Sequence, residues 1–319
     1  MVKKIIIFIT FFAFISCANP LHRNTFVVAG TYLEVISPYR KAAGIVFREF
    51  ERLDKIFNHY DPASELAKLN KTFNKEVKVS EDLLKVLELS QEVYNLSNGA
   101  FDVSCGVLYD FWKGLINQDK ITEFPDDKKL EGLKESCGME NIAVDVSRST
   151  VTIKKQGLQI DLGAIAKGYM VDKAIEKLKQ NGIDSALVNA GGDIYCLGKN
   201  KDKPWKAGIK DPEELDEVLE SQDLVDEAIA TSGNYEQFFE FKGRIYSHLA
   251  DPRSGYPVEN NILSVSIVSS NCVTADSLAT AFFIMGTDKV REFLVKNPST
   301  MKIFIVTLDE GKKNIHIFE

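Results

Sequence analysis

Residues 161–174 read DLGAIAKGYMVDKA, a segment in which a short β run ends and an amphipathic helix begins. Asp161 ends the β run, and Gly163 and Ala164 carry little or no side chain, so backbone groups there are open to a ligand. Lys167, at the start of the expected helix, is placed to meet a phosphate. The alternative is a purely structural segment, in which Asp161 caps the helix, Gly163 permits the turn and Lys167 faces solvent.

The elements around this segment predict an α+β fold with mostly antiparallel or mixed sheets and packed helices, because strands and helices do not alternate strictly. The expected strands lie at residues 25–37, 142–146 and 150–154, with further short β runs at 236–247 around a turn at Lys242 and Gly243, and the expected helices lie at about residues 38–57, 80–97, 167–180 and 274–296.

Charge and motifs exclude several classes of protein. The formal net charge of −7 disfavours nucleic acid or an anionic membrane surface as the partner. No GxGxxG or GxxxxGK[ST] loop follows a strand, and no GxSxG, HExxH or EF-hand motif is present. Any nucleotide chemistry therefore uses another scaffold.

Residues 1–17 predict a lipoprotein signal peptide. Two lysines precede an apolar run at residues 5–15, which is too short to span a bilayer as a helix. The small residues before Cys17 resemble the bacterial lipobox, in which the cysteine is lipidated and becomes the mature N-terminus. Plain cleavage and an uncleaved anchor are the alternatives. Residues 18–24 then form a tether, and residues 25–319 form one domain.

The other four cysteines are Cys105, Cys137, Cys196 and Cys272, and they form no CxxC pair. Their spacing therefore suggests neither a zinc site nor a redox motif. We expect free, mostly buried thiols, although an exported protein of this sequence could form up to two disulfides.

Two further stretches carry more Gly, Asp and small polar residues than packing requires. NAGGDIYCLG (189–198) permits either close backbone approach to a ligand or a tight hairpin, and we prefer the hairpin, with Asp193 as a candidate polar anchor. YSHLADPRSGYP (246–257) has turn residues beside His248. A lone histidine is more often structural than catalytic, so a catalytic role for His248 is supported only by the other candidate residues found with it.

The stretch TADSLATAFFIMG (274–286) places Asp276 and Thr280 four residues apart on one face of a helix that we expect Thr274 to cap. A carboxylate and a hydroxyl suit a hard cation such as Mg²⁺, which takes oxygen ligands. The alternative is that Asp276 only complements the helix dipole and Thr280 is packed.

Taken in order, these stretches resemble the blocks of the ApbE-type flavin transferase family, the FAD:protein FMN transferases, in its lipoprotein form. The similar blocks are HYDPASELAKLN (59–70), SNGAFDVSCGVLYDFW (97–112), DLGAIAKGYMVD (161–172), NAGGD (189–193), ATSGNYEQFF (230–239), SHLADPRSGYP (247–257) and SVSIVSSNCVTADSLATAFFIMG (264–286). The resemblance runs from about Thr25 to the C-terminus and implies that residues 25–319 are a catalytic domain.

The resemblance implies an enzyme that binds FAD with Mg²⁺, transfers the FMN moiety to a Ser or Thr hydroxyl of a target protein and releases AMP. Targets would include subunits of membrane redox complexes. The implied metal ligands are the Ala164 carbonyl and the side chains of Asp276 and Thr280. His248 is the preferred catalytic base, and Asp276 is the alternative. The implied flavin-binding residues are Ala29, Tyr60, Ala100, Phe101, Asp102, Asp161, Lys167 and Ala250, to which we add Asp193.

The sequence departs from the family at Asn58 and His59, where Ser and Thr are usual, and at Ala29, where many members have Met. Tyr60 is retained. Some relatives, notably in spirochaetes, carry another residue at the tyrosine position and hydrolyse FAD to FMN and AMP. Tyr60 therefore favours transfer, while Asn58 and His59 leave a hydrolytic side activity open.

Three other functions compete with FMN transfer: FAD pyrophosphatase activity, FAD binding without turnover, and a structural lipoprotein. The expected location is a bacterial membrane, to which the exported protein is anchored by lipid, facing the periplasm or the cell exterior.

Overall fold

The computed structural model describes residues 20–116, 124–214, 216–234, 238–242, 244–247, 249–298 and 300–319. Cys17, the expected lipidation site, and His248, the expected catalytic histidine, lie outside the described residues.

An eight-stranded sheet forms one part of the fold, and each pair of neighbouring strands in it is antiparallel. In spatial order the strands are β1 (His22–Val28), β2 (Thr31–Ser37), β6 (Ala186–Ala190), β7 (Asp193–Leu197), β10 (Glu227–Gly233), β13 (Ile262–Ser269), β14 (Lys302–Asp309) and β15 (Lys312–Phe318). The predicted α+β class with antiparallel sheets is confirmed.

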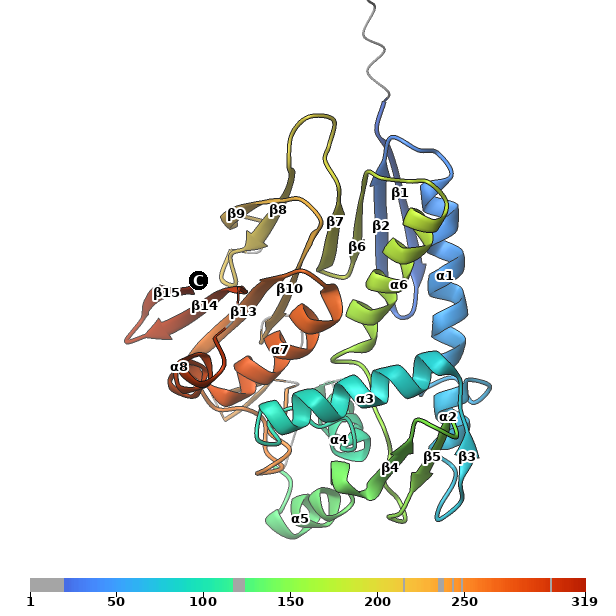
Figure 1. The fold of residues 1–319 in the computed structure, drawn as a ribbon. Coiled ribbons are helices and arrows are strands. Elements are labelled where there is room, and N and C mark those ends of the chain that lie inside the picture. Colours follow the sequence, from blue (N-terminus) through green and yellow to red (C-terminus); the bar gives the residue numbers. More distant parts are fainter. Residues whose placement is uncertain are drawn as a thin grey trace, which may run out of the picture.

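Both faces of this sheet are covered at β6, where successive side chains point to opposite faces. In β6, Val188 packs in the main core beneath α1 (Ala42–Phe57), α6 (Ala166–Gln180) and α7 (Cys272–Met285), which lie over one face (Figure 1). Its neighbour Leu187 joins a separate cluster with Trp205 of the hairpin formed by β8 (Trp205–Lys210) and β9 (Val218–Leu224).

A second group of elements lies at one end of these helices (Figure 1). Its helices are α2 (Glu65–Leu69), α3 (Glu81–Leu96), α4 (Gly106–Ile116) and α5 (Asp127–Glu135), and its three-stranded sheet has the order β3 (Val77–Lys78), β5 (Thr150–Ile153), β4 (Ile142–Asp145). A short 3-10 helix at Met139–Asn141, the hairpin of β11 (Phe238–Phe241) and β12 (Arg244–Ser247), and α8 (Thr287–Lys296) complete the described elements.

Three expected boundaries are wrong. Residues 25–37 are not one strand, because Ala29 and Gly30 adopt positive φ values of 52° and 69° and turn the chain between β1 and β2. The expected helix at 38–57 begins only at Ala42. The expected helix at 274–296 is two helices, because Gly286, with φ 84°, separates α7 from α8.

The expected cap of α7 is also wrong, because Asn271 and not Thr274 caps this helix. The Asn271 side chain accepts a hydrogen bond from the Thr274 N–H at 2.9 Å. The NAGGD stretch does form the preferred hairpin, with Gly191 and Gly192 at positive φ between β6 and β7.

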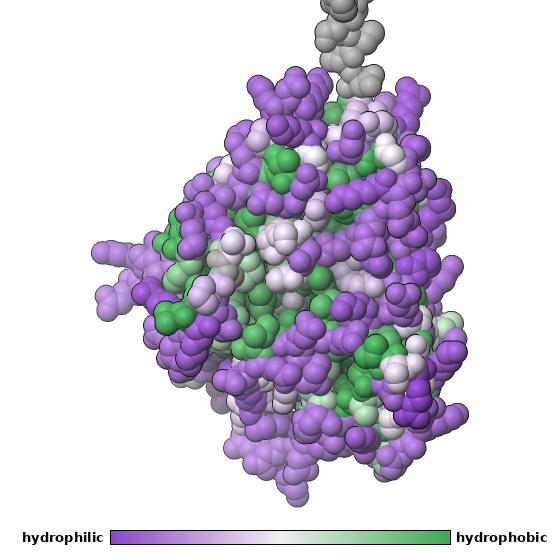
Figure 2. Space-filling view, viewed as in Figure 1, coloured by the Kyte–Doolittle hydropathy of each residue, from purple (hydrophilic) through white to green (hydrophobic). Residues whose placement is uncertain are grey.

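The face seen in Figure 1 is mostly hydrophilic, with hydrophobic side chains in smaller patches between the hydrophilic ones (Figure 2). Within the part of the chain that the structure describes, no helix combines the length and the apolar character needed to cross a bilayer.

Candidate functional site

Residues from both groups of elements line one pocket of about 260 Å³. Its walls come from α4, α6, α7, β10 and the segments 100–103, 161–164 and 249–250. Ten residues singled out from the sequence line it: Ala100, Phe101, Asp102, Asp161, Gly163, Ala164, Lys167, Ala250, Asp276 and Thr280.

Asp276 and Lys167 form a polar part of the pocket wall, and the buried carboxyl group of Asp193 lies directly behind it. The Lys167 ammonium lies 2.5 Å from Asp193 Oδ2 and 3.9 Å from Asp276 Oδ1. Burial and the neighbouring Asp276 carboxylate raise the pKa of Asp193 to about 8, against the opposite effect of Lys167. Two carboxylates so close together do not both ionise readily without added positive charge, so this wall favours a cation.

At the start of α6 the Ala166 N–H donates to the Leu162 carbonyl and the Tyr169 N–H to the Ile165 carbonyl. The Gly168 N–H, which would reach the Ala164 carbonyl in a longer helix, donates instead to Asp276 Oδ2 at 3.0 Å. The Ala164 carbonyl oxygen therefore does not accept a hydrogen bond from the Gly168 N–H, and Ala164 lines the pocket.

A reciprocal contact joins α6 and α7 at the N-terminus of α7. Asp172 of α6 accepts hydrogen bonds from the N–H groups of Cys272 and Val273, which begin α7, at 2.8 and 2.9 Å. Each helix thus supplies a carboxylate to the N-terminal N–H groups of the other, where the helix dipole favours negative charge. Burial nevertheless raises the pKa of Asp172 to about 6.

Hydroxyl groups extend the oxygen-rich wall beyond Asp276. Thr280 Oγ1 lies 2.9 Å from Ser232 Oγ of β10, and both residues line the pocket. Asp276 and Thr280 both face the pocket from α7, as their spacing predicts. Carboxylate, hydroxyl and carbonyl oxygens form a donor set that fits a hard divalent cation.

The segment after α3, residues 100–103, also lines the pocket. The Phe101 N–H donates to Ser97 Oγ at 3.0 Å, and Asp102 Oδ1 accepts from the Ser104 N–H at 2.8 Å. The Tyr109 hydroxyl donates to the Asp102 carbonyl at 2.8 Å. Burial raises the pKa of Asp102, so this carboxyl is ionised less readily than an exposed one.

Three described residues expected at the site do not line the pocket. Asp193 lies behind the wall and contacts it through Lys167. Tyr60 is 64% exposed and touches the lining residue Lys113, with 3.5 Å between its hydroxyl and the ammonium. Ala29 lies at the turn between β1 and β2, where it packs against the main core.

The pocket also contains residues that the sequence reasoning missed. Tyr109 and Lys113, four residues apart on α4, both line it, and Lys113 forms an ion pair with Asp161 at 3.0 Å. Ser232 was missed as well. The i, i+4 spacing of Tyr109 and Lys113 indicates a shared helix face, but nothing local indicates that this face meets Asp161.

The family model for the ApbE family matches residues 27–305, which is most of the chain. The chain belongs to the ApbE family. The ApbE-family resemblance noted from the sequence blocks is thereby confirmed.

Two curated relatives called FAD:protein FMN transferase illustrate the similarity. The one from Vibrio cholerae is 32% identical over 272 residues, which are 83% of this chain and 79% of the relative. The one from Treponema pallidum is 32% identical over 279 residues, 82% of this chain and 75% of the relative.

Solved ApbE structures share the fold. The ApbE protein from Thermotoga maritima has a TM-score of 0.82 at 30% identity and covers 93% of this chain and 96% of its own. The flavin transferase ApbE from Vibrio cholerae has a TM-score of 0.81 at 26% identity, with 93% of this chain and 97% of its own covered.

Proposed function

We propose that the protein transfers the FMN moiety of FAD to a Ser or Thr hydroxyl of a target protein and releases AMP, with Mg²⁺ as cofactor. The observation that carries the proposal is the buried Asp276 carboxylate at the wall of a pocket in an ApbE-family chain, with Lys167 beside it and the buried Asp193 behind. The relatives' name, FAD:protein FMN transferase, supports FAD and a protein acceptor as the substrates.

Asp276, Thr280 and the Ala164 carbonyl would hold Mg²⁺, with Asp193 adding negative charge behind them. Mg²⁺ held there would neutralise charge on the pyrophosphate of FAD and stabilise the leaving AMP. The hydrogen bond from the Gly168 N–H fixes Asp276 from one side and orients its other oxygen. Lys167, held beside both carboxylates, provides a cation for the phosphates of FAD.

The acceptor hydroxyl needs a base to take its proton, and we propose His248 for this role. His248 directly precedes Leu249 and Ala250 in the sequence, and both of these line the pocket. Asp276 is the alternative base. Backbone groups at residues 100–102, with Asp161, would bind the flavin part of FAD.

We expect the purified protein, given FAD, Mg²⁺ and an exported redox protein as acceptor, to add the mass of one FMN to that acceptor with release of AMP. Mass spectrometry of the acceptor measures the adduct, and chromatography measures AMP. An acceptor in which the modified Ser or Thr is replaced by Ala is the control. Equal consumption of FAD with and without acceptor, and no adduct, would replace the transferase proposal by the pyrophosphatase.

We also propose that Cys17 carries lipid and anchors the exported domain, residues 25–319, to a membrane through the tether at residues 18–24. The lysines, apolar run and small residues before Cys17 support this proposal.

Cys17→Ala is expected to abolish labelling of the protein by an alkyne fatty acid in cells, because the acylated thiol is lost. Cys196→Ala, which removes a buried thiol of the folded domain, is the control and should label normally. Undiminished labelling of Cys17→Ala would contradict the anchor.

A further inference from the structure

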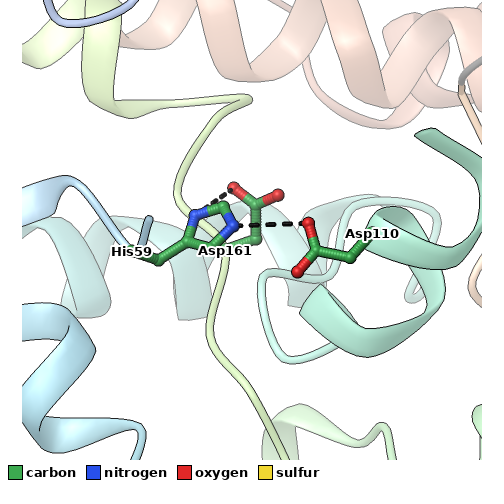
Figure 3. Close-up of side chains that lie close together, drawn as sticks. All are labelled: His59, Asp110 and Asp161. Carbon is green, nitrogen blue, oxygen red and sulfur yellow. Dashed lines mark hydrogen bonds and ion pairs between the residues drawn. The ribbon is translucent and has the colours of Figure 1, made fainter. Parts of the chain in front are cut away.

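His59 lies between two carboxylates that come from different parts of the chain (Figure 3). Its Nε2 atom is 3.4 Å from Asp110 Oδ1 of α4, and its Nδ1 atom is 3.6 Å from Asp161 Oδ1, in the segment before α6. The His59 side chain is only 10% exposed. An imidazole buried between two acids fixes the spacing of the elements that carry them.

Tyr60 is held by the same group of side chains. Its hydroxyl donates to Asp110 Oδ1 at 3.0 Å, the atom that His59 also approaches. The rings of His59 and Tyr60 have centroids 3.8 Å apart. The tyrosine is therefore restrained at its tip and along its ring, although most of the residue is exposed.

Lys113 connects this group to the pocket. Its ammonium lies 3.0 Å from Asp161 Oδ2 and 3.5 Å from the Tyr60 hydroxyl. Lys113 and Asp161 both line the pocket, whereas His59 and Tyr60 do not line it but contact these two residues. The nearby Asp161 carboxylate raises the pKa of Lys113 despite its burial, so the ammonium stays charged at neutral pH.

We propose that Lys113 binds FAD at the pocket wall beside Tyr60, the flavin-binding residue that the family resemblance implies, and that His59, with Asp110, is a positioning residue for Tyr60. The ligand class rests on the proposed function. An ammonium suits an anionic oxygen of the dinucleotide, and a restrained aromatic ring suits one of its flat ring systems. Restraint before binding raises affinity because less side-chain freedom is lost on binding.

A metal ion on His59, Asp110 and Asp161 is the competing interpretation of the same cluster. Their ligand atoms lie within 4.8 Å of one another. However, the Lys113 ammonium is already 3.0 Å from Asp161, and the Tyr60 hydroxyl already occupies Asp110 Oδ1. A positive charge at that distance repels a divalent cation, so the geometry favours positioning.

Replacement of His59 by Ala is expected to weaken FAD binding about tenfold without changing the fold. Affinity is measured by quenching of flavin fluorescence in the absence of added metal, and the fold by thermal unfolding. Lys113→Met should weaken binding similarly, because the ammonium at the pocket wall is lost. His22→Ala, at the start of β1, is the matched control and should bind FAD like the unmodified protein.

A double substitution tests whether His59 acts through Tyr60. If it does, His59→Ala combined with Tyr60→Ala binds FAD no more weakly than Tyr60→Ala alone, because the two changes remove one shared effect. Steady-state transfer should show a raised KM for FAD with kcat changed less than about threefold, and His59→Gln should recover part of the affinity.

If the losses of FAD affinity caused by the two single substitutions add up in the double variant, the positioning role of His59 is overturned. Wild-type FAD affinity in His59→Ala would also overturn it. Tight binding of Zn²⁺ by the unmodified protein that His59→Ala abolishes, with FAD affinity unchanged, would establish the metal site instead. If the protein binds FAD but forms no FMN adduct, only the transferase proposal is refuted. Failure of the transferase proposal can therefore be told apart from failure of the positioning proposal.

Discussion

Asp276→Ala should lower the rate of FMN transfer by about a thousandfold, which corresponds to about 4 kcal/mol of lost transition-state stabilisation. Asp276 is buried at the pocket wall, accepts the Gly168 N–H and lies beside Lys167, so its removal leaves both partners without this carboxylate. The measurement is the initial rate of AMP release and of adduct formation at controlled Mg²⁺ concentrations.

One companion variant tests whether the charge or the shape of Asp276 matters, and a second, at another acidic residue, is the control. Asp276→Asn keeps an oxygen for the Gly168 N–H but loses the charge, and is expected to be nearly as slow as Asp276→Ala. Asp288→Ala removes an exposed acid from the first turn of α8 and should leave the rate unchanged. Full activity of Asp276→Ala at limiting Mg²⁺ would refute the metal assignment.

Gly168→Ala is expected to destabilise the protein by about 2 to 3 kcal/mol and to remove most of the activity. A methyl group at this position would lie 2.6 Å from the Cys272 carbonyl oxygen and 2.8 Å from Asp276 Cβ. Since the first of these atoms belongs to the backbone, α6 and α7 would have to separate. That separation would displace Asp276 from the pocket wall.

Urea unfolding measures the change in stability, and AMP release measures the activity. Gly132→Ala is the matched control, because Gly132 also lies within a helix, α5, but a methyl group added there would meet no atom within 4 Å. Its effect should be small or slightly stabilising, since alanine favours the helix. Comparable losses of stability and activity in Gly168→Ala and Gly132→Ala would show that the close contact of α6 and α7 is unimportant.

Local sequence patterns predict much of the fold, because period and turn chemistry are local properties. The β4 and β5 strands and helices α3 and α6 lie where apolar spacing places them, and Gly191 and Gly192 form the expected hairpin. The turn at Ala29 and Gly30 was missed because apolar residues run from Phe26 to Ala29 without a polar break, so that only Gly30 signals the turn.

The site was predictable only where one element carries the whole signal. Asp276 and Thr280 share a helix face, so their spacing shows that they act together. The contact of Lys167 with Asp193 and that of Lys113 with Asp161 join elements far apart in the chain. Such contacts depend on how α4, α6 and β7 pack, which no local pattern encodes.

The exchanged carboxylates of α6 and α7 bear on the order in which the protein folds. The bonds from Cys272 and Val273 to Asp172 span 100 and 101 residues, and the bond from Gly168 to Asp276 spans 108. Contacts so distant in sequence form only after large loops have closed. A nascent or truncated chain that lacks α7 therefore leaves the N-terminus of α6 incomplete, and cannot bind substrate through a half-formed pocket.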